Sequence, residues 1–297
     1  MPSFLYSRAR VSGWRRSDGA RDEAPLAGGA AAEEAGLHHG TASPLDPVGW
    51  ASLAGATFAA ALLQAASGFG FAILALPLYL IFLDPAHAVQ LVIILTTALS
   101  VVVLPGLRQA IVPGLLARLL FGTLVGVPIG LLAFRYADPH WIRAVIGIAI
   151  LGFAGLFLAL RGRRWSAGSL FRANRASDLT AGALSGAATA MVGIGGPPVL
   201  LYLLFAGVSP LSIRATLLAF FFLSYAAAVV SHGVTVGIPE ATWLGAGILF
   251  PFVLVGGFLG KRLGDRVGAD TFVALALVLL AATAVYTLAT AVLPDIR

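Results

Sequence analysis

Ten apolar segments dominate the sequence and constrain its fold more than any other feature. Several approach or exceed the roughly 20 residues that an α-helix needs to cross a hydrocarbon core of about 30 Å. The 297-residue chain is 59% hydrophobic and only 11% charged, whereas soluble domains carry roughly 25% charged residues. The apolar–polar alternation of a transmembrane β-barrel is not present. The sequence therefore predicts an all-α, polytopic helical membrane protein.

The segments form two sets of five, separated by the basic stretch RGRRWSAGSLFRANRASD. In each set the second segment is too short to span a membrane unless its glycine-rich entry lies inside the bilayer, so we expect about 8 to 10 membrane segments. The segments cover roughly residues 48–66, 71–83, 86–104, 114–134 and 141–160 in the first set, and 179–192, 197–208, 210–232, 240–262 and 271–293 in the second.

The chain divides into four parts on this basis. Residues 1–47 are rich in Arg, Gly, Ala and acidic residues, which predicts a disordered tail. Polar sequence follows Arg15 and Arg16, so we expect neither a twin-arginine nor a general secretory signal. We expect a first membrane repeat over 48–160, a basic cytoplasmic connector over 161–178, and a second membrane repeat over 179–293.

The two sets are homologous halves that share landmarks in the same order. Asp or Ser before Pro predicts a capped helix start, and glycines four residues apart on a membrane helix allow close packing with another helix. We assign the last landmark to packing and the others to helix starts and breaks. The landmarks are Gly68 with Gly193, Gly70 with Gly195, Asp84-Pro85 with Ser209-Pro210, and Gly126 and Gly130 with Gly256 and Gly260.

The distribution of Lys and Arg favours inverted repeats. If all five segments of each half cross, the basic residues near the segment ends concentrate on one side, as the positive-inside rule requires of the cytoplasmic side. If the short segments are instead re-entrant, the repeats become parallel and the asymmetry falls. With inverted repeats, the cytoplasmic side receives Arg108, Arg118, Arg161, Arg163, Arg164, Arg172, Arg175, Arg214, Lys261, Arg262 and Arg266, and the outside receives Arg135, Arg143 and Arg297.

A glycine-rich break interrupts each half, as GFGFAILA at 68–75 and GIGGPPVL at 193–200. Glycine relaxes the helical preference, and proline removes a backbone donor. Broken helices persist in lipid only where protein or a water-filled cavity covers them. A helix that begins there directs its free N–H groups and the positive end of its dipole inward, so two such starts suit a small anion. The alternative interpretation is that each break is a kink.

The breaks and their polar neighbours supply the candidate site residues. The hydroxyl groups of Ser67, Thr96, Thr97, Ser100, Ser224 and Tyr225 are secondary candidates, since such groups more often bond helix to helix. The expected substrate-binding residues are Gln64, Gly68, Gly70, Phe71, Thr189, Gly193, Gly195, Gly196 and Pro197.

Several function classes are disfavoured by what the sequence lacks. There is no cysteine, and the 19 basic residues form no stripe for nucleic acid. His38 and His39 lie in the tail and are interpreted as incidental. The carboxylates Asp84, Asp138, Glu240 and Asp265 fall at segment ends or in loops, whereas a proton or cation antiporter should bury one. We therefore expect no metal, no cofactor and no catalysis.

These features together resemble the sulfite exporter TauE/SafE family of bacterial membrane proteins over about residues 48–293. The family's motif of glycines followed by proline falls on Gly193, Gly195, Gly196, Pro197 and Pro198. In the first half it falls on Gly68 and Gly70 but continues as Phe71, Ala72 and Ile73. The resemblance implies a transporter of small sulfur-containing anions, such as sulfite or organosulfonates, in the cytoplasmic membrane.

We therefore expect a multi-pass inner-membrane transporter that exports such an anion or facilitates its passage. Its partners would be the small anion and the lipid bilayer, and a homo-oligomer is compatible with the sequence. Two alternatives stay open at this point. One is a proton-coupled transporter of a small organic acid, and the other is a non-transporting membrane assembly protein.

Overall fold

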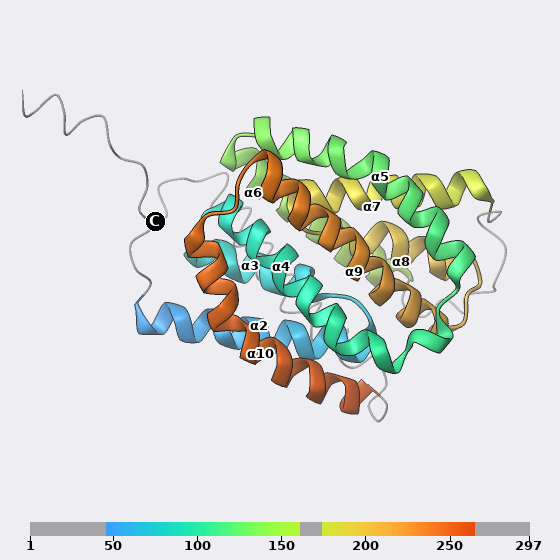
Figure 1. Cartoon of the computed structure of the whole chain (residues 1–297), viewed down its shortest axis with the longest axis horizontal. Helices are drawn as coiled ribbons and strands as arrows, with labels where there is room; N and C mark the ends of the chain where they lie inside the picture. The colour runs from blue at the N-terminus through green and yellow to red at the C-terminus, as the bar shows by residue number, and fades with distance from the viewer. Residues whose placement is uncertain (1–45, 161–173, 265–297) are drawn as a thin grey trace, which may run out of the picture. The chain divides into compact units, whose positions relative to one another are not determined.

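The computed structural model describes residues 46–160 and 174–264, which are all helical or in short connections (Figure 1). The predicted tail, most of the connector and the last predicted segment, 271–293, lie outside these residues. The first half contains α2 (Pro47–Ser67), α3 (Phe71–Phe82), α4 (Pro85–Val103), the 3₁₀ turns η1 (Leu104–Gly106) and η2 (Arg108–Ala110), α5 (Pro113–Tyr136) and α6 (Pro139–Leu160). The second contains α7 (Arg175–Val192), α8 (Gly196–Phe205), α9 (Pro210–Thr235) and α10 (Glu240–Gly264).

Five of the described helices are long and apolar enough to cross a membrane: α2, α4 with η1, α5, α9 and α10. The predicted short segments are short helices, α3 with 12 residues and α8 with 10. Large apolar side chains on the outer face of α5, such as Phe121 and Leu124, are exposed, as are Trp243 and Phe258 on α10. Such faces suit contact with lipid. The fold is that of a helical membrane protein.

The helices α4 and α9 begin at the capped positions that the sequence predicted. The Asp84 carboxylate accepts the N–H groups of Ala86 and His87 at 3.1 Å, and the Ser209 hydroxyl accepts that of Ser212 at 3.3 Å. Burial alone would raise the pKa of Asp84, but its hydrogen bonds with the His87 side chain and backbone outweigh burial and lower that pKa. Both predicted caps are confirmed. The start of α7 differs: a capping box of Asn174 and Ser177 begins it before the predicted residue 179.

Glycine stripes bind helices of opposite halves, α5 to α7 and α10 to α2 (Figure 1). A Cβ added at Gly126 would lie 2.8 Å from the Ala183 carbonyl carbon, and one at Gly256 would lie 2.6 Å from the Phe58 carbonyl oxygen. Ala183 and Phe58 are equivalent in the repeat alignment. The packing role predicted for these glycines is therefore confirmed, and each half completes its packing with a helix of the other.

The contacts along these stripes also give the helix directions. Gly122, Gly126 and Gly130 of α5 meet α7 at Leu179, Ala183 and Ala187 in turn, so α5 and α7 run the same way. By the same argument, α10 runs with α2, because Gly256, Gly260 and Gly264 meet Phe58, Leu62 and Ala66.

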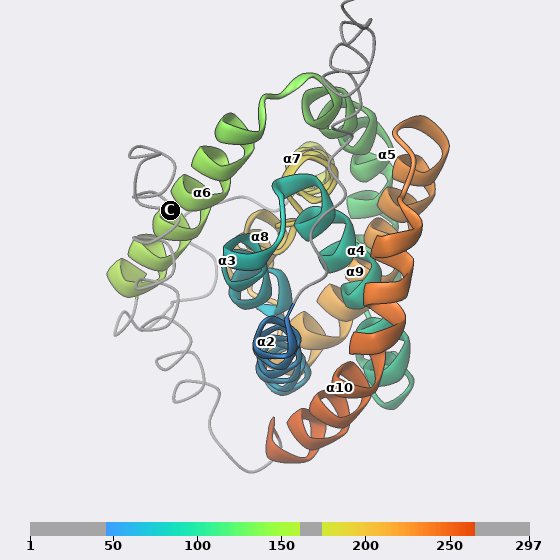
Figure 2. The same ribbon diagram turned by 90° about the vertical axis from the view of Figure 1, so that its left-hand side faces the viewer.

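The most deeply buried of the long helices are α4 and α9, which pack on each other (Figure 2). Gln90, near the start of α4, donates to the carbonyl of Gly237, just after α9, at 2.8 Å. The start of one helix therefore meets the end of the other. α3 packs on α4, and α8 packs on α9, so each short helix follows its break into this buried layer.

Candidate functional site

The second break is held by a tyrosine of α9. Gly193 ends α7 in the left-handed conformation, with φ of 71°, which glycine adopts without a steric penalty. The Tyr225 hydroxyl donates to the Gly193 carbonyl at 2.9 Å and accepts the Gly195 N–H at 3.2 Å. Tyr225 is 2% exposed. One side chain therefore satisfies two backbone groups that the break removes from the helix.

The same break packs tightly on the last turns of α7. The Ser185 hydroxyl donates to the Gly195 carbonyl, and the Thr189 hydroxyl donates to the Ser185 carbonyl at 2.8 Å. A Cβ at Gly195 would lie 2.8 Å from the Ser185 carbonyl oxygen and 3.1 Å from the Thr189 Cβ. Only glycine fits at position 195 without displacing α7.

The first break also begins at a left-handed glycine, but its backbone then differs, because Gly70 has φ of 110° and the equivalent Gly195 has φ of −84°. Gly68 ends α2 with φ of 90°, and a Cβ there would lie 3.1 Å from the Cα of Arg214 in α9. The Gln64 side chain reaches past the break and accepts the Phe71 N–H at 3.1 Å through Oε1. Gln64 and Thr189 occupy the same position of the repeat. Both were expected in the site, and each contacts the region of its own break.

The amide nitrogen of Gln64 is the unusual group at this break. The residue is only 1% exposed, and Nε2 has no hydrogen-bond partner among the residues that the structure describes. Buried polar groups are generally hydrogen-bonded. An amide donor therefore lies buried and available beside the start of α3, a helix whose N-cap, Gly70, provides no side-chain cap.

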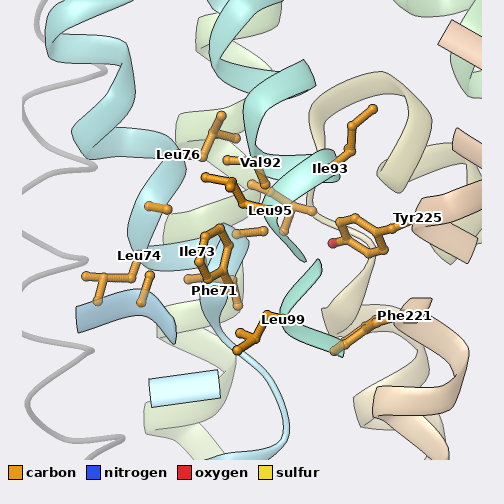
Figure 3. Packing of buried hydrophobic residues seen from close by; sticks show 14 of the residues in the cluster. Phe71, Ile73, Leu74, Leu76, Val92, Ile93, Leu95, Leu99, Phe221 and Tyr225 are labelled. Atoms are coloured by element: carbon orange, nitrogen blue, oxygen red, sulfur yellow. The ribbon is translucent and has the colours of Figure 1, made fainter. Parts of the chain in front are cut away.

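The nine expected substrate-binding residues lie in the interior of the described part of the chain. All nine are buried except Pro197, which is half-buried. Figure 3 shows Phe71, the first residue of α3, in the same cluster as Leu95 and Leu99 of α4 and Phe221 and Tyr225 of α9. A Cβ at Gly196, the first residue of α8, would lie 3.2 Å from the Phe221 ring. Both short helices thus begin against the α4–α9 layer.

Each break packs on a helix of the opposite half. Gly68 packs on Arg214 of the second half, whereas Gly193 packs on Val89 and Val92 of the first. Val89 and Arg214 are equivalent positions. Each break therefore packs on the third helix of the opposite half, and the expectation of one central site between the two helix starts stays a prediction.

One buried carboxylate was missed by the sequence interpretation. Asp178 was placed in the connector, but it lies in the first turn of α7 and is 3% exposed. Arg118 of α5 and the Tyr202 hydroxyl of α8 both donate to it. A signal was available, because Asp178, Gly182, Ser185 and Thr189 recur on one helical face.

Within residues 46–160 and 174–264, no group of three or more His, Asp or Glu residues is placed so that it could hold a metal ion. The groups at the breaks that could bind a ligand are hydrogen-bond donors: an amide, hydroxyl groups and backbone N–H groups. That set suits a small anion or polar solute.

Comparison with known proteins identifies the family. The model of the sulfite exporter TauE/SafE family matches residues 53–287. That range contains both breaks and both glycine stripes. No curated protein and no solved structure matches the chain. The chain therefore belongs to the sulfite exporter TauE/SafE family of membrane transporters.

Proposed function

We propose that this protein exports a small sulfur-containing anion, sulfite or an organosulfonate, across the cytoplasmic membrane, and that the anion binds at the start of α3. The observation that carries the binding site is the buried, unpaired Gln64 Nε2 donor beside the start of α3, where the N-cap residue Gly70 has no side chain to cap the first turn. Family membership supports the transport of a sulfur-containing anion. A potential of about 100 mV, negative inside, favours exit of each negative charge by about 2.3 kcal/mol.

The first break offers more backbone donors than the second. The free N–H groups of a helix lie in its first turn. In α3 these belong to Phe71, Ala72 and Ile73, of which Phe71 already donates to Gln64. In α8 two of the corresponding positions are Pro197 and Pro198, which carry no N–H. We infer that the α3 start is the anion site and that the α8 start, fixed by Tyr225, is its support.

Inverted repeats of five segments each are part of the proposal. The start of α9 meets the end of α2 at Arg214 and Gly68. The start of α5 meets the start of α9, since the Val112 N–H donates to the Thr216 hydroxyl at 3.2 Å. Because α5 runs with α7, these contacts support opposite directions for α7 and its counterpart α2. The Lys and Arg distribution supports the same topology.

Access to the site would alternate through relative movement of two helix pairs. Glycine stripes fix α5 to α7 and α2 to α10, so each pair moves as one body. Each break contacts the opposite half, at Arg214 or at Val89. A displacement between the bodies therefore changes the surroundings of both breaks.

The test is anion flux into proteoliposomes with a panel of sulfite, thiosulfate, sulfonates and carboxylates. Gln64→Leu removes the amide donor, and a hydrogen bond to a charged group is worth roughly 1.5–3 kcal/mol, so KM should rise roughly 10- to 150-fold. Gln90→Leu is the matched control, because Gln90 is also buried and its amide donates to the Gly237 carbonyl. Its KM should stay within about threefold of the wild type.

Two results would oppose the proposal at different levels. No flux of any anion would remove the transporter assignment and favour a non-transporting assembly protein. Equal KM values for Gln64→Leu and the wild type would remove the α3 site while leaving transport in place.

A second candidate is proton-coupled transport of a small organic acid. The observation that favours it is the buried Asp178, since buried carboxylates are typical of proton-coupled carriers. Its pairing with Arg118 and Tyr202 favours a structural role instead. Carboxylate uptake that stops when the proton gradient is abolished at constant potential would support the second candidate.

A further inference from the structure

Arg214 of α9 brings a permanent positive charge to the first break. Its backbone lies against Gly68, where an added Cβ would be 3.1 Å from the Arg214 Cα and 2.8 Å from its Cγ. The guanidinium reaches the last turn of α2 and donates through Nη2 to the Ala65 carbonyl. In a continuous helix that carbonyl would accept the Phe69 N–H, which instead meets the Ser67 hydroxyl at 3.3 Å. The glycine at position 68 therefore allows an arginine to lie across the break.

This contact places the guanidinium beside the residues of the proposed anion site. Gln64, whose Nε2 is buried and unpaired within the described residues, comes immediately before Ala65 in the last turn of α2. The Gln64 carbonyl accepts the Gly68 N–H at 2.7 Å, and its side chain accepts the Phe71 N–H at the start of α3. Arg214 contacts the same short stretch of chain, at Ala65 and at Gly68.

The second break indicates that capping a broken helix does not require a charge. Ala190 is the repeat equivalent of Ala65, and its carbonyl oxygen lies 2.8 Å from Nε2 of His232 in α9. A carbonyl only accepts, so Nε2 carries the hydrogen, and a neutral imidazole can make this bond. A guanidinium, by contrast, is always charged. The charge at the first break therefore exceeds what the capping role needs.

The two caps lie at opposite ends of α9. Arg214 is near its start and His232 is in its last turn, about 27 Å apart at 1.5 Å per residue. The first half has Val89 at the position equivalent to Arg214, so the second break packs on an aliphatic side chain where the first packs on a charged one. Prolines also remove backbone donors from the first turn of α8 and not from that of α3. Charge and backbone donors thus coincide at the first break.

We propose that Arg214 is the residue that selects anions at the start of α3, and that its charge favours dianions over monoanions. This inference rests on the proposed function. Guanidinium groups suit oxyanions because their hydrogen bonds are charge-assisted. The negative end of the α2 dipole favours the guanidinium at this position, and the positive end of the α3 dipole attracts the same anion. In the proposed topology Arg214 lies toward the cytoplasm, the side from which an exported anion enters.

The charge of the anion gives the proposal a quantitative signature. Coulomb energy is proportional to the product of the two charges. Removing the Arg214 charge therefore costs a dianion, such as thiosulfate, twice the binding free energy that it costs a monoanion, such as methanesulfonate. Because affinity depends exponentially on free energy, the factor by which KM rises for the dianion should be the square of the factor for the monoanion.

The test is the flux of thiosulfate and of methanesulfonate into proteoliposomes at neutral pH. Arg214→Gln removes the charge but keeps an amide donor, and KM should rise about tenfold for methanesulfonate and about 100-fold for thiosulfate. Arg214→Lys restores the charge, so its KM for thiosulfate should lie about tenfold or more below that of Arg214→Gln. Arg262→Gln is the control. Arg262 is exposed in the last turn of α10, and solvent screens such charges, so both KM values should stay within about threefold of the wild type.

A purely structural role for Arg214 would give a different pattern. An equal change in KM for the two anions, or a fall in kcat with both KM values unchanged, would overturn the proposal. If Arg214→Gln does not fold, ¹⁵N NMR of the arginine Nε groups in the wild type replaces it. The signal that is absent from Arg214→Lys should shift when thiosulfate is added, and an unchanged signal would overturn the proposal.

Failure of this inference can be distinguished from failure of the proposed function. A wild type that transports anions, together with wild-type KM values in Arg214→Gln, refutes the role of Arg214 alone. A wild type that transports no anion of the panel refutes the proposed function as well.

Discussion

Replacement of Gly126 by alanine should separate α5 from α7. The added Cβ would lie 2.8 Å from the Ala183 carbonyl carbon and closer still to its oxygen, whereas ordinary contact begins at 3.4 Å. The helices must therefore move apart by at least 0.6 Å, the difference between these distances. A backbone carbonyl cannot rotate away as a side chain can. Overpacking of this kind costs about 1–3 kcal/mol, so we expect the free energy of unfolding to fall by about 2 kcal/mol.

Gly247→Ala is the matched control, since Gly247 lies on exposed α10 surface with nothing within 4 Å of an added Cβ. Its unfolding free energy should be unchanged or rise by up to about 1 kcal/mol through helix propensity. The assay is SDS-induced unfolding in mixed micelles, followed by tryptophan fluorescence. Gly126→Ala and Gly256→Ala act on separate helix pairs, so their effects should add within about 0.5 kcal/mol. Equal stability of the Gly126 and Gly247 variants would refute the close-packed stripe.

Two further predictions concern the buried polar groups. Tyr225→Phe leaves the Gly193 carbonyl and the Gly195 N–H unsatisfied, at about 1–3 kcal/mol each, and should lower both stability and flux. The control Tyr79→Phe, which loses its bond to the Thr57 hydroxyl, should leave flux intact. Equal flux in both variants would contradict the role of Tyr225 in holding the second break. Asp178→Asn removes the charge that Arg118 and Tyr202 share, and thermal unfolding should show a loss of about 2 kcal/mol; wild-type stability would mean that the pair contributes nothing.

Local features of the fold could be predicted from the sequence because they depend on neighbouring residues. The caps at Asp84 and Ser209 and the breaks at Gly68 and Gly193 each follow from the conformational preferences of one or two residues. The glycine stripes were identified from their spacing. Which helix each stripe contacts could not be predicted, because a spacing of four describes one surface and not its partner.

The candidate site was predictable only in part for the same reason. Gln64 was identified from its position before a break, but its vacant amide depends on the path of α3. Asp178 was missed because a charged residue in a basic stretch resembles a loop, and only the approach of Arg118 from α5 makes its burial tolerable. His232 caps Ala190 across α7 and α9, a contact that no local pattern encodes.

Because each half packs against a helix of the other, the order of synthesis also limits the order in which the chain can fold. A ribosome delivers α2 to the membrane long before α10, and α5 before α7. The Phe58–Gly256 contact is thus unavailable until nearly the whole chain has been inserted, whereas a chain of independent halves could finish the first half early. Late closure between distant residues slows folding. In the N-terminal half, the glycine-stripe faces of α2 and α5 must therefore wait in the bilayer for α10 and α7, although α2, α3 and α4 can already pack on one another.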